Sequence, residues 1–147
     1  DASEFRRQYL DILARQTALL DGAEETIEAL AEVVGLLLIT NGLSEVQRPR
    51  FASSTIGRFF PEVVISEELG IAKPDPAIFD DAFARIGRPA KERVLMVGDN
   101  LGSDILGGAS YGIDTCWFNP AALSNGHEVE PDHEIRSLSE ILAIVGI

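Results

Sequence analysis

The sequence predicts an α/β fold with a doubly wound parallel sheet, in which helices cover both faces of the sheet. Segments with helical periodicity and short apolar runs alternate four times along the 147 residues. The runs are apolar throughout, as is typical of parallel strands that are buried on both faces. A chain of this length and apolar content can form one hydrophobic core.

The predicted elements follow from apolar spacing and from residues that begin or end helices. Asp21-Gly22-Ala23-Glu24 resembles a capping box with Asp21 as the N-cap, and Asp75-Pro76 is a strong helix start. Pro49 is expected to kink or split its helix, and residues 120–132 are expected to form a polar loop. The predicted strands are 35–40, 62–66, 93–98 and 114–119, and the predicted helices are 4–20, 22–34, 44–56, 75–86, 101–111 and 137–145.

Charge and composition narrow the functional classes. The net charge of −12 argues against a nucleic-acid partner, which would require clusters of Lys and Arg. The single cysteine, Cys116, excludes an internal disulfide and indicates a reducing compartment. No run of about 20 apolar residues is present, so we expect no membrane partner and a soluble, cytoplasmic protein. The sequence does not indicate an oligomeric state.

Polar residues follow three of the predicted strands. Thr40, Asn41 and Gly42 follow the first, Lys73 lies in the segment after the second, and Asp99 with Asp104 follows the third. Ligands bind at the carboxyl ends of strands in such sheets. A hydroxyl and backbone N–H groups can bind phosphate oxygens, and an ammonium can neutralise their charge. Carboxylate oxygens are suited to Mg²⁺, so this set favours phosphoryl chemistry on a small phosphomonoester.

The order strand–Thr, Lys-Pro, strand–Gly-Asp-x4-Asp is similar to three motifs of the haloacid dehalogenase superfamily. The resemblance implies that Thr40, Asn41 and Gly42 bind the phosphoryl group and that Lys73 holds it together with a nucleophile. It also implies that Asp99 ligates Mg²⁺ and that Asp104 supports the metal through water or outer contacts. Residues 1–20 would then be the end of a helical cap, and residues 21–147 an incomplete Rossmann-like core.

A finer likeness points to one branch of this superfamily. The segments that together resemble the pyrimidine 5′-nucleotidase group are Ile39 to Gly42, Ile65 to Glu68, Lys73-Pro74, Met96 to Asp99, Asp104 to Gly108 and Thr115 to Asn119. The sialic-acid-9-phosphate phosphatase branch has a similar Thr-Asn-Gly, so it stays an alternative. The resemblance therefore implies a magnesium-dependent phosphatase that acts through an aspartyl-phosphate, with a nucleoside 5′-monophosphate as the favoured substrate.

One superfamily motif has no counterpart in this chain. The family's first, central strand ends in Asp-x-Asp, whose first residue attacks phosphorus, and the sequence contains no Asp-x-Asp. The chain also starts at Asp1, and its only methionine is Met96, so we expect a truncated chain that is inactive alone. Two alternatives stay open: a non-catalytic phosphate- or partner-binding module, and a metal-independent haloacid dehalogenase. A response-regulator receiver would place its acids before Thr and Lys, the reverse of the order here.

Several conspicuous residues have simpler explanations than chemistry. Gly107 and Gly108 lie within a predicted helix, and we expect them to permit close helix–sheet packing. We expect Cys116 to be an inert buried thiol and Trp117 to be a core residue. Glu67 and Glu68 are expected to be solvated near the mouth of the site.

Overall fold

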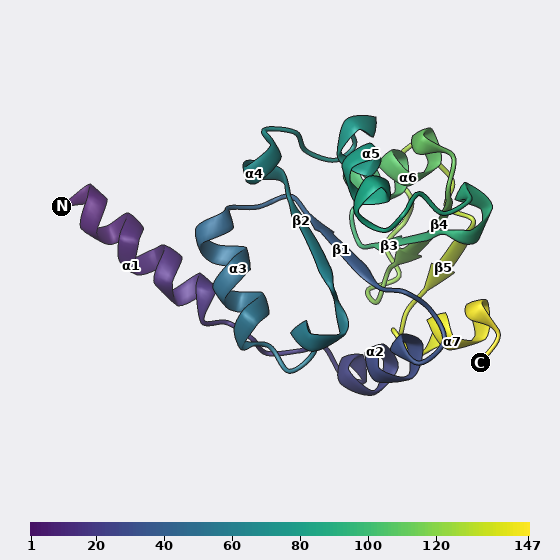
Figure 1. Ribbon diagram of the computed structural model, residues 1–147, viewed down its shortest axis with the longest axis horizontal. Helices are drawn as coiled ribbons and strands as arrows, with labels where there is room; N and C mark the ends of the chain where they lie inside the picture. The colour runs from purple at the N-terminus through teal and green to yellow at the C-terminus, as the bar shows by residue number, and fades with distance from the viewer. The chain divides into compact units, whose positions relative to one another are not determined.

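The computed structural model describes residues 1–147 and consists of two compact units, residues 1–70 and residues 71–147 (Figure 1). All strand pairs in both units are parallel, which confirms the predicted α/β class. No helix in the chain has the length and apolar character needed to span a membrane.

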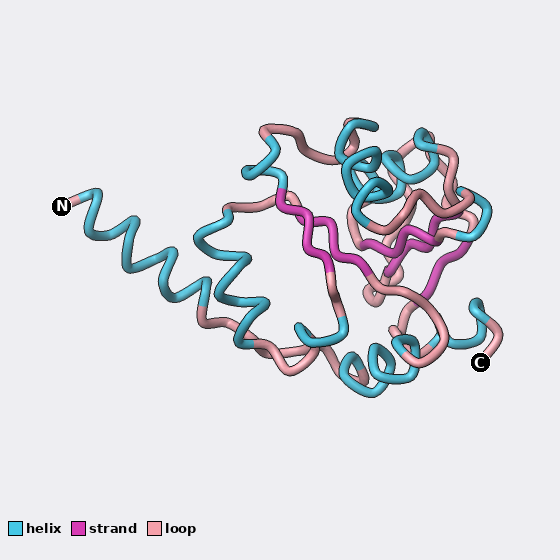
Figure 2. Tube along the Cα trace, viewed as in Figure 1, coloured by secondary structure: helices cyan, strands magenta, loops and turns pink.

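The first unit contains a two-stranded parallel sheet and the helices that precede and connect its strands. Figure 2 shows the two strands, β1 and β2, running side by side. Their register pairs Leu37 with Glu62 and Thr40 with Ile65, so both strands end at the same edge. The elements are α1 (Ala2–Ala14), α2 (Ala23–Ala31), β1 (Leu37–Thr40), α3 (Ser44–Ser53), the short helix η1 (Gly57–Phe59), β2 (Glu62–Ile65) and α4 (Ser66–Leu69).

Helix α1 ends earlier than the sequence predicts. The expected helix reached residue 20, whereas α1 ends at Ala14 and packs beside α3. The Arg50 guanidinium of α3 donates hydrogen bonds to the Leu13 carbonyl from Nε (3.2 Å) and from Nη2 (2.9 Å). A side chain from a neighbouring helix thus satisfies one of the last carbonyls of α1, which local sequence does not reveal.

The predicted capping box at Asp21 was wrong. Helix α2 begins one residue later, with Gly22 as its N-cap at φ 72°, and no side chain caps it. This left-handed conformation is readily open to glycine and lets the chain turn into the helix there. Thr26 then donates its hydroxyl proton to the Gly22 carbonyl at 2.6 Å.

Helix α3 is not split at Pro49, although the sequence led us to expect a kink or a break. The helix runs from Ser44 to Ser53 with Pro49 inside it and stops short of the predicted residue 56. Proline removes one backbone donor, but the helix continues through it. Arg50, the next residue, is the one that anchors the end of α1.

The second unit contains a three-stranded parallel sheet in the order β3-β4-β5 (Figure 1). Helices connect β3 to β4, whereas residues 119–132 connect β4 to β5 without a helix. Gly98 at the end of β3 pairs with Trp117 of β4, and Phe118 pairs with Ile135 of β5. The elements are α5 (Pro76–Arg85), the short helix η2 (Lys91–Arg93), β3 (Leu95–Gly98), the π-helical turn η3 (Leu101–Ile105), α6 (Leu106–Tyr111), β4 (Asp114–Phe118), β5 (His133–Ile135) and α7 (Glu140–Val145).

Strand β5 was missed by the sequence analysis, which ended the sheet at the fourth strand. Only Ile135 of this strand is a buried apolar residue, so no apolar run marks it. Hydrogen bonds fix the residue before the strand instead. The backbone N–H and the hydroxyl of Thr115 both donate to the Asp132 carboxylate, at 2.8 and 2.9 Å. These bonds lower the pKa of Asp132. The closing helix also starts later than expected, at Glu140.

Two features of the second unit were predicted correctly. Asp75 caps α5 by accepting a hydrogen bond from the Ala77 N–H at 2.9 Å, and Pro76 is the first helical residue. The core includes Ile78 and Phe79 of α5, both fully buried.

Cys116 is fully buried as well, and this burial, with a smaller contribution from the charge of Glu140, raises the pKa of its thiol to about 11. Such a thiol is chemically inert at neutral pH.

The expected single sheet is present as two sheets. Strands β1 and β3, which the resemblance would place on either side of the absent central strand, each pair along one edge only. All their residues are half-buried, whereas three residues of β4, at the centre of its sheet, are buried. The apolar runs that predict full burial therefore remain partly exposed in β1 and β3.

Gly107 and Gly108 confirm the prediction of close packing. A Cβ on Gly107 would lie 2.8 Å from the Phe79 ring, and a Cβ on Gly108 would lie 2.9 Å from Thr115 Cγ2 and 3.0 Å from Met96 Cβ. The glycines therefore let α6 approach α5 and the β3-β4 sheet.

We expect Gly108→Ala to lower the free energy of unfolding by about 1–2 kcal/mol, because overpacking against rigid atoms outweighs the better helix propensity of Ala. Urea titration followed by circular dichroism measures this change. Gly126→Ala is the matched control, since a Cβ there meets no atom within 4 Å. A Gly108 variant as stable as this control would contradict the packing explanation.

Candidate functional site

One set of candidate site residues, in the first unit, lies in the loop that leaves β1. Thr40 is the last residue of the strand, and Asn41 and Gly42 follow it. Because β1 and β2 are parallel, the segments after both strands lie at one edge of the sheet. The Gly42 N–H donates to Ser66 Oγ at 3.1 Å, so the two segments are joined directly.

A second link fixes the start of α3. Glu67 accepts a hydrogen bond from the Ser44 N–H at 2.7 Å, and Glu68 accepts one from the Ser44 hydroxyl at 2.5 Å. Arg48 donates to both carboxylate oxygens of Glu68, at 2.8 and 2.6 Å. The sequence analysis expected these acids to be solvated. In the structure they are also hydrogen-bonded to protein groups. Glu67, from the segment that follows the neighbouring strand, thus satisfies the first backbone N–H of α3, and Glu68 binds side chains of that helix.

These contacts affect how the Thr40 loop could bind phosphate. The predicted phosphate-binding set was Thr40, Asn41 and Gly42. The Gly42 N–H already donates to Ser66, so a phosphate oxygen would have to share or displace that bond. Thr40 is half-buried and Asn41 is exposed, which suits residues that meet a ligand at the edge of a sheet.

A second set of candidate site residues, in the second unit, centres on Asp104. Lys73 Nζ lies 2.8 Å from Asp104 Oδ1, and both side chains are only 8% exposed. Asp104 Oδ2 accepts a hydrogen bond from the Asn100 N–H at 3.1 Å, and Oδ1 accepts one from the Ser103 hydroxyl at 3.3 Å. One carboxylate thus connects the Lys73 segment to the turn that follows β3.

The shape of that turn explains the Gly-Asp-x4-Asp spacing. Asp104 lies on the π-helical turn η3, whose N-cap, Asn100, accepts a hydrogen bond from the Ser103 N–H at 2.9 Å. The turn folds the Asp104 side chain against the backbone of Gly98, where any added Cβ would overlap it. Glycine is therefore required immediately before Asp99 by this close approach.

Asp99 is placed where a metal ligand could act. It directly follows β3 and is exposed, whereas Asp104 is buried and bonded to protein donors. This difference fits Asp99 as a direct ligand and Asp104 as an outer support. The residues contain no group of three or more His, Cys, Asp and Glu side chains that could hold a metal. Mg²⁺ is usually bound by one or two carboxylates, water and substrate phosphate, so the donors present fit this ion.

The predicted site residues therefore form two sets. Residues 71–147 bring Lys73 and Asp104 into contact and tie Asp99 to Asp104 through the adjacent Asn100 N–H. Residues 1–70 contain the Thr40 loop. Sequence reasoning missed Ser66 and Trp117, whose indole N–H donates to the Asp99 carbonyl at 3.1 Å. The contact of Trp117 depends on the strand register, which pairs Gly98 with Trp117 and which neither strand's sequence reveals alone.

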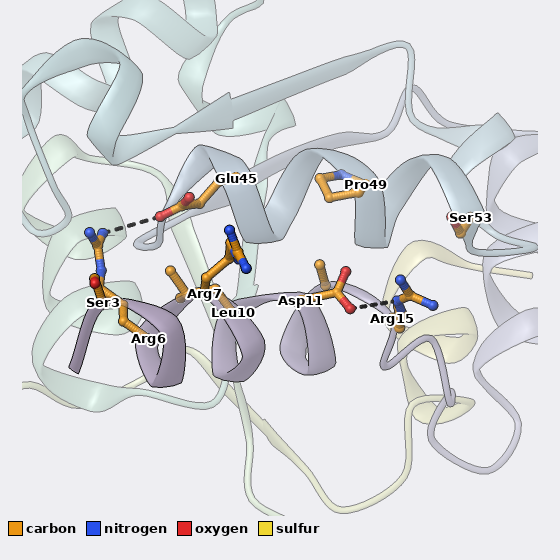
Figure 3. A pocket seen from close by; sticks show the side chains of 10 residues that line it. Ser3, Arg6, Arg7, Leu10, Asp11, Arg15, Glu45, Pro49 and Ser53 are labelled. Atoms are coloured by element: carbon orange, nitrogen blue, oxygen red, sulfur yellow. Dashed lines mark hydrogen bonds and ion pairs between the residues drawn. The ribbon is translucent and has the colours of Figure 1, made fainter. Parts of the chain in front are cut away.

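A separate groove of about 480 Å³ lies between α1 and α3 (Figure 3). Its charged side chains are paired with one another: Arg6 with Glu45, and Arg15 with Asp11. None of the predicted site residues lines it. The residues around it are Ser3, Arg6, Arg7, Leu10, Asp11, Ala14, Arg15, Glu45, Pro49 and Ser53.

Comparison with known proteins decides the family. The model of the haloacid dehalogenase-like hydrolases matches residues 1–112. The chain belongs to this family. It is 37% identical to the HAD-hydrolase YfnB of Bacillus subtilis over 147 residues, which are the whole of this chain and 63% of YfnB. It is 37% identical over 97% of its length to the pyrimidine 5′-nucleotidase PynA of Streptococcus pneumoniae, covering 60% of PynA.

Solved structures of this family share the same fold. The magnesium-bound crystal structure of YfnB matches with a TM-score of 0.91 and 38% identity, over 96% of this chain and 62% of YfnB. A 2-haloacid dehalogenase from Pseudomonas syringae matches with a TM-score of 0.77 and 32% identity, over 88% of this chain and 54% of that one. This chain of the haloacid dehalogenase-like family spans about three fifths of the length of such relatives.

We expect Lys73→Ala to destabilise the second unit by about 3 kcal/mol, because it leaves the buried Asp104 carboxylate without its cation. Urea unfolding at neutral pH measures this loss. The double variant Lys73→Met, Asp104→Asn is the matched control, since it removes both charges and should recover much of the stability. If Lys73→Ala unfolded at the wild-type urea concentration, the ion pair would not be a buried, coupled interaction.

Proposed function

We propose that this protein is the larger part of a magnesium-dependent phosphatase that hydrolyses small phosphomonoesters. The observation that carries the proposal is the buried Lys73–Asp104 pair beside the exposed Asp99. Burying such a pair costs desolvation energy that apolar residues would not. The arrangement is therefore better explained by chemistry than by stability. An ammonium held by a buried carboxylate, on the turn that follows the strand-end residue Asp99, suits phosphoryl transfer.

Each residue has a distinct role in this proposal. The Lys73 ammonium has three N–H donors, so it can hold Asp104 and a phosphate oxygen together. The Thr40 hydroxyl and Asn41 orient the phosphoryl group by hydrogen bonds, and Asp104 keeps Lys73 and the turn after β3 in place. Asp99 would hold Mg²⁺, which when bound neutralises phosphate charge.

The nucleophile is the part of the proposal that this chain does not supply. We propose that an aspartate of an Asp-x-Asp strand attacks phosphorus and forms an aspartyl-phosphate, as in the family that the chain belongs to. The 147-residue sequence contains no such pair, so we expect the chain alone to be inactive. The free buried thiol of Cys116 is compatible with a reducing compartment, and we propose the cytoplasm.

A nucleoside 5′-monophosphate is the substrate that we favour. Support comes from two relatives named as pyrimidine 5′-nucleotidases, PynA and the Escherichia coli protein YjjG, which are 37% and 36% identical to this chain. Other relatives are named for different phosphate esters, including a phosphoserine phosphatase of Thermus thermophilus that is 34% identical over 78% of the chain. The phosphomonoester class is common to these names, and the nucleotide is the narrower proposal.

A haloacid dehalogenase is the second candidate, because the 2-haloacid dehalogenase of Pseudomonas syringae shares the fold at 32% identity. Such an enzyme needs no metal. The exposed Asp99 argues against this reading, because Asp104 is already bonded to Lys73 and to the turn, whereas a carboxylate exposed at the end of a strand suits a metal ligand.

We expect a longer protein that joins this chain to an Asp-x-Asp strand to hydrolyse p-nitrophenyl phosphate with Mg²⁺. Lys73→Ala should lower kcat by about 100-fold or more, because charge stabilisation at the transferred phosphoryl group is lost. Absorbance of released p-nitrophenol measures the rate.

Two controls accompany this assay. Lys91→Ala removes the only other lysine, whose Nζ donates to the Tyr111 carbonyl, and should leave kcat within about threefold of wild type if the variant folds. The 147-residue chain alone should give no turnover above buffer. Normal activity of the Lys73 variant would refute the proposed role of Lys73, and turnover by the chain alone would refute the need for an Asp-x-Asp strand.

A further inference from the structure

Trp117 is the only tryptophan of the chain, and it lies against the turn that carries Asp99. Its side chain is buried in the second unit, where β4 runs beside β3 (Figure 1). In the parallel ladder Trp117 is paired with Gly98, the residue before Asp99. From there its indole Nε1–H donates a hydrogen bond to the main-chain oxygen of Asp99 at 3.1 Å.

The peptide group between Asp99 and Asn100 is consequently held at both ends. Its oxygen accepts from Trp117, and its N–H donates to Asp104 Oδ2 at 3.1 Å. A peptide group is planar, so rotation about its flanking bonds would break both hydrogen bonds together. Two side chains from different elements, one aromatic and one acidic, therefore fix the backbone on which the Asp99 carboxylate is mounted.

The surroundings of the indole separate two possible roles. The ring packs with Leu101 and Ile105 of the turn η3 and with Val129, and this apolar contact is a core role that another aromatic ring could fill. The hydrogen bond to Asp99 is different, because it requires an N–H at one place on the ring. A phenylalanine would keep most of the packing and lose only the bond.

We propose that Trp117 is a positioning residue for Asp99, and that it acts by fixing the Asp99–Asn100 peptide group. The part of this inference that concerns metal affinity rests on the proposed function, in which Asp99 holds Mg²⁺. The part that concerns the backbone does not. Without the indole N–H, the peptide group keeps a single anchor at Asp104, and the Asp99 carboxylate samples orientations that bind the ion less well.

The test compares Trp117→Phe with Tyr111→Phe in the same protein. Tyr111 is the matched control because it is also a buried aromatic residue of the second unit that donates one hydrogen bond, to Asp80 Oδ1 at 2.7 Å. Amide hydrogen exchange at Asn100 and Asp104, resolved by NMR, reports the turn directly. Calorimetric titration with Mg²⁺ reports the affinity.

For Trp117→Phe we expect exchange at Asn100 to become at least several-fold faster relative to amides of the β3-β4 ladder, and the Kd for Mg²⁺ to rise by about tenfold. Tyr111→Phe should change neither quantity. A uniform acceleration of exchange throughout the unit, or no change at Asn100, would mean that Trp117 only fills the core, and the inference would be overturned. If Asn100 exchanges faster but the wild-type protein binds no Mg²⁺, the positioning role stands and the proposed metal role of Asp99 fails.

Discussion

The candidate site residues of the second unit depend on the contacts of the buried Asp104 carboxylate. It pairs with Lys73 at 2.8 Å, accepts hydrogen bonds from Asn100 and Ser103, and lies against Gly98. Each of these contacts joins Asp104 to a residue that is itself a predicted site residue or is next to one in the sequence. A buried charge with one partner removed is strongly unfavourable, so the segments are constrained to the arrangement that satisfies it. The exposed Asp99 consequently precedes a turn whose backbone is hydrogen-bonded to the Asp104 side chain.

The same construction recurs in the first unit with different residues. The loop after β1 and the segment after β2 are joined by Gly42 donating to Ser66 and by Ser44 donating to Glu67 and Glu68. In both units a polar side chain from one segment satisfies backbone groups of another, because strand ends leave N–H groups without ladder partners. The parallel register makes this possible, since it brings the carboxyl ends of neighbouring strands to one edge. The candidate site residues of this chain are thus supported by their neighbours along the sheet edge.

Much of this arrangement could be predicted from the sequence, and the exceptions share a physical cause. The strands ending at Thr40 and Gly98 are readable because apolar runs stop at polar residues, and Asp75-Pro76 marks its helix by local geometry. The contacts of Ser66 and Trp117 depend on which residues face one another across a sheet, and that register is not written in either strand alone. Strand β5 was not predicted for a similar reason. Hydrogen bonds from Thr115 to Asp132 fix the residue before this strand, and Ile135 is its single buried apolar residue.

We propose that the candidate site residues serve phosphate chemistry with a metal. The family also includes enzymes that act on haloacids. The most direct measurement follows two products from a longer protein that joins this chain to an Asp-x-Asp strand. Inorganic phosphate is measured with a nucleoside 5′-monophosphate, and chloride is measured with 2-chloropropionate, each with Mg²⁺ and with EDTA. This proposal predicts that phosphate is released, that EDTA abolishes this release, and that no chloride is released. Chloride release that persists in EDTA, without phosphate release, would contradict it.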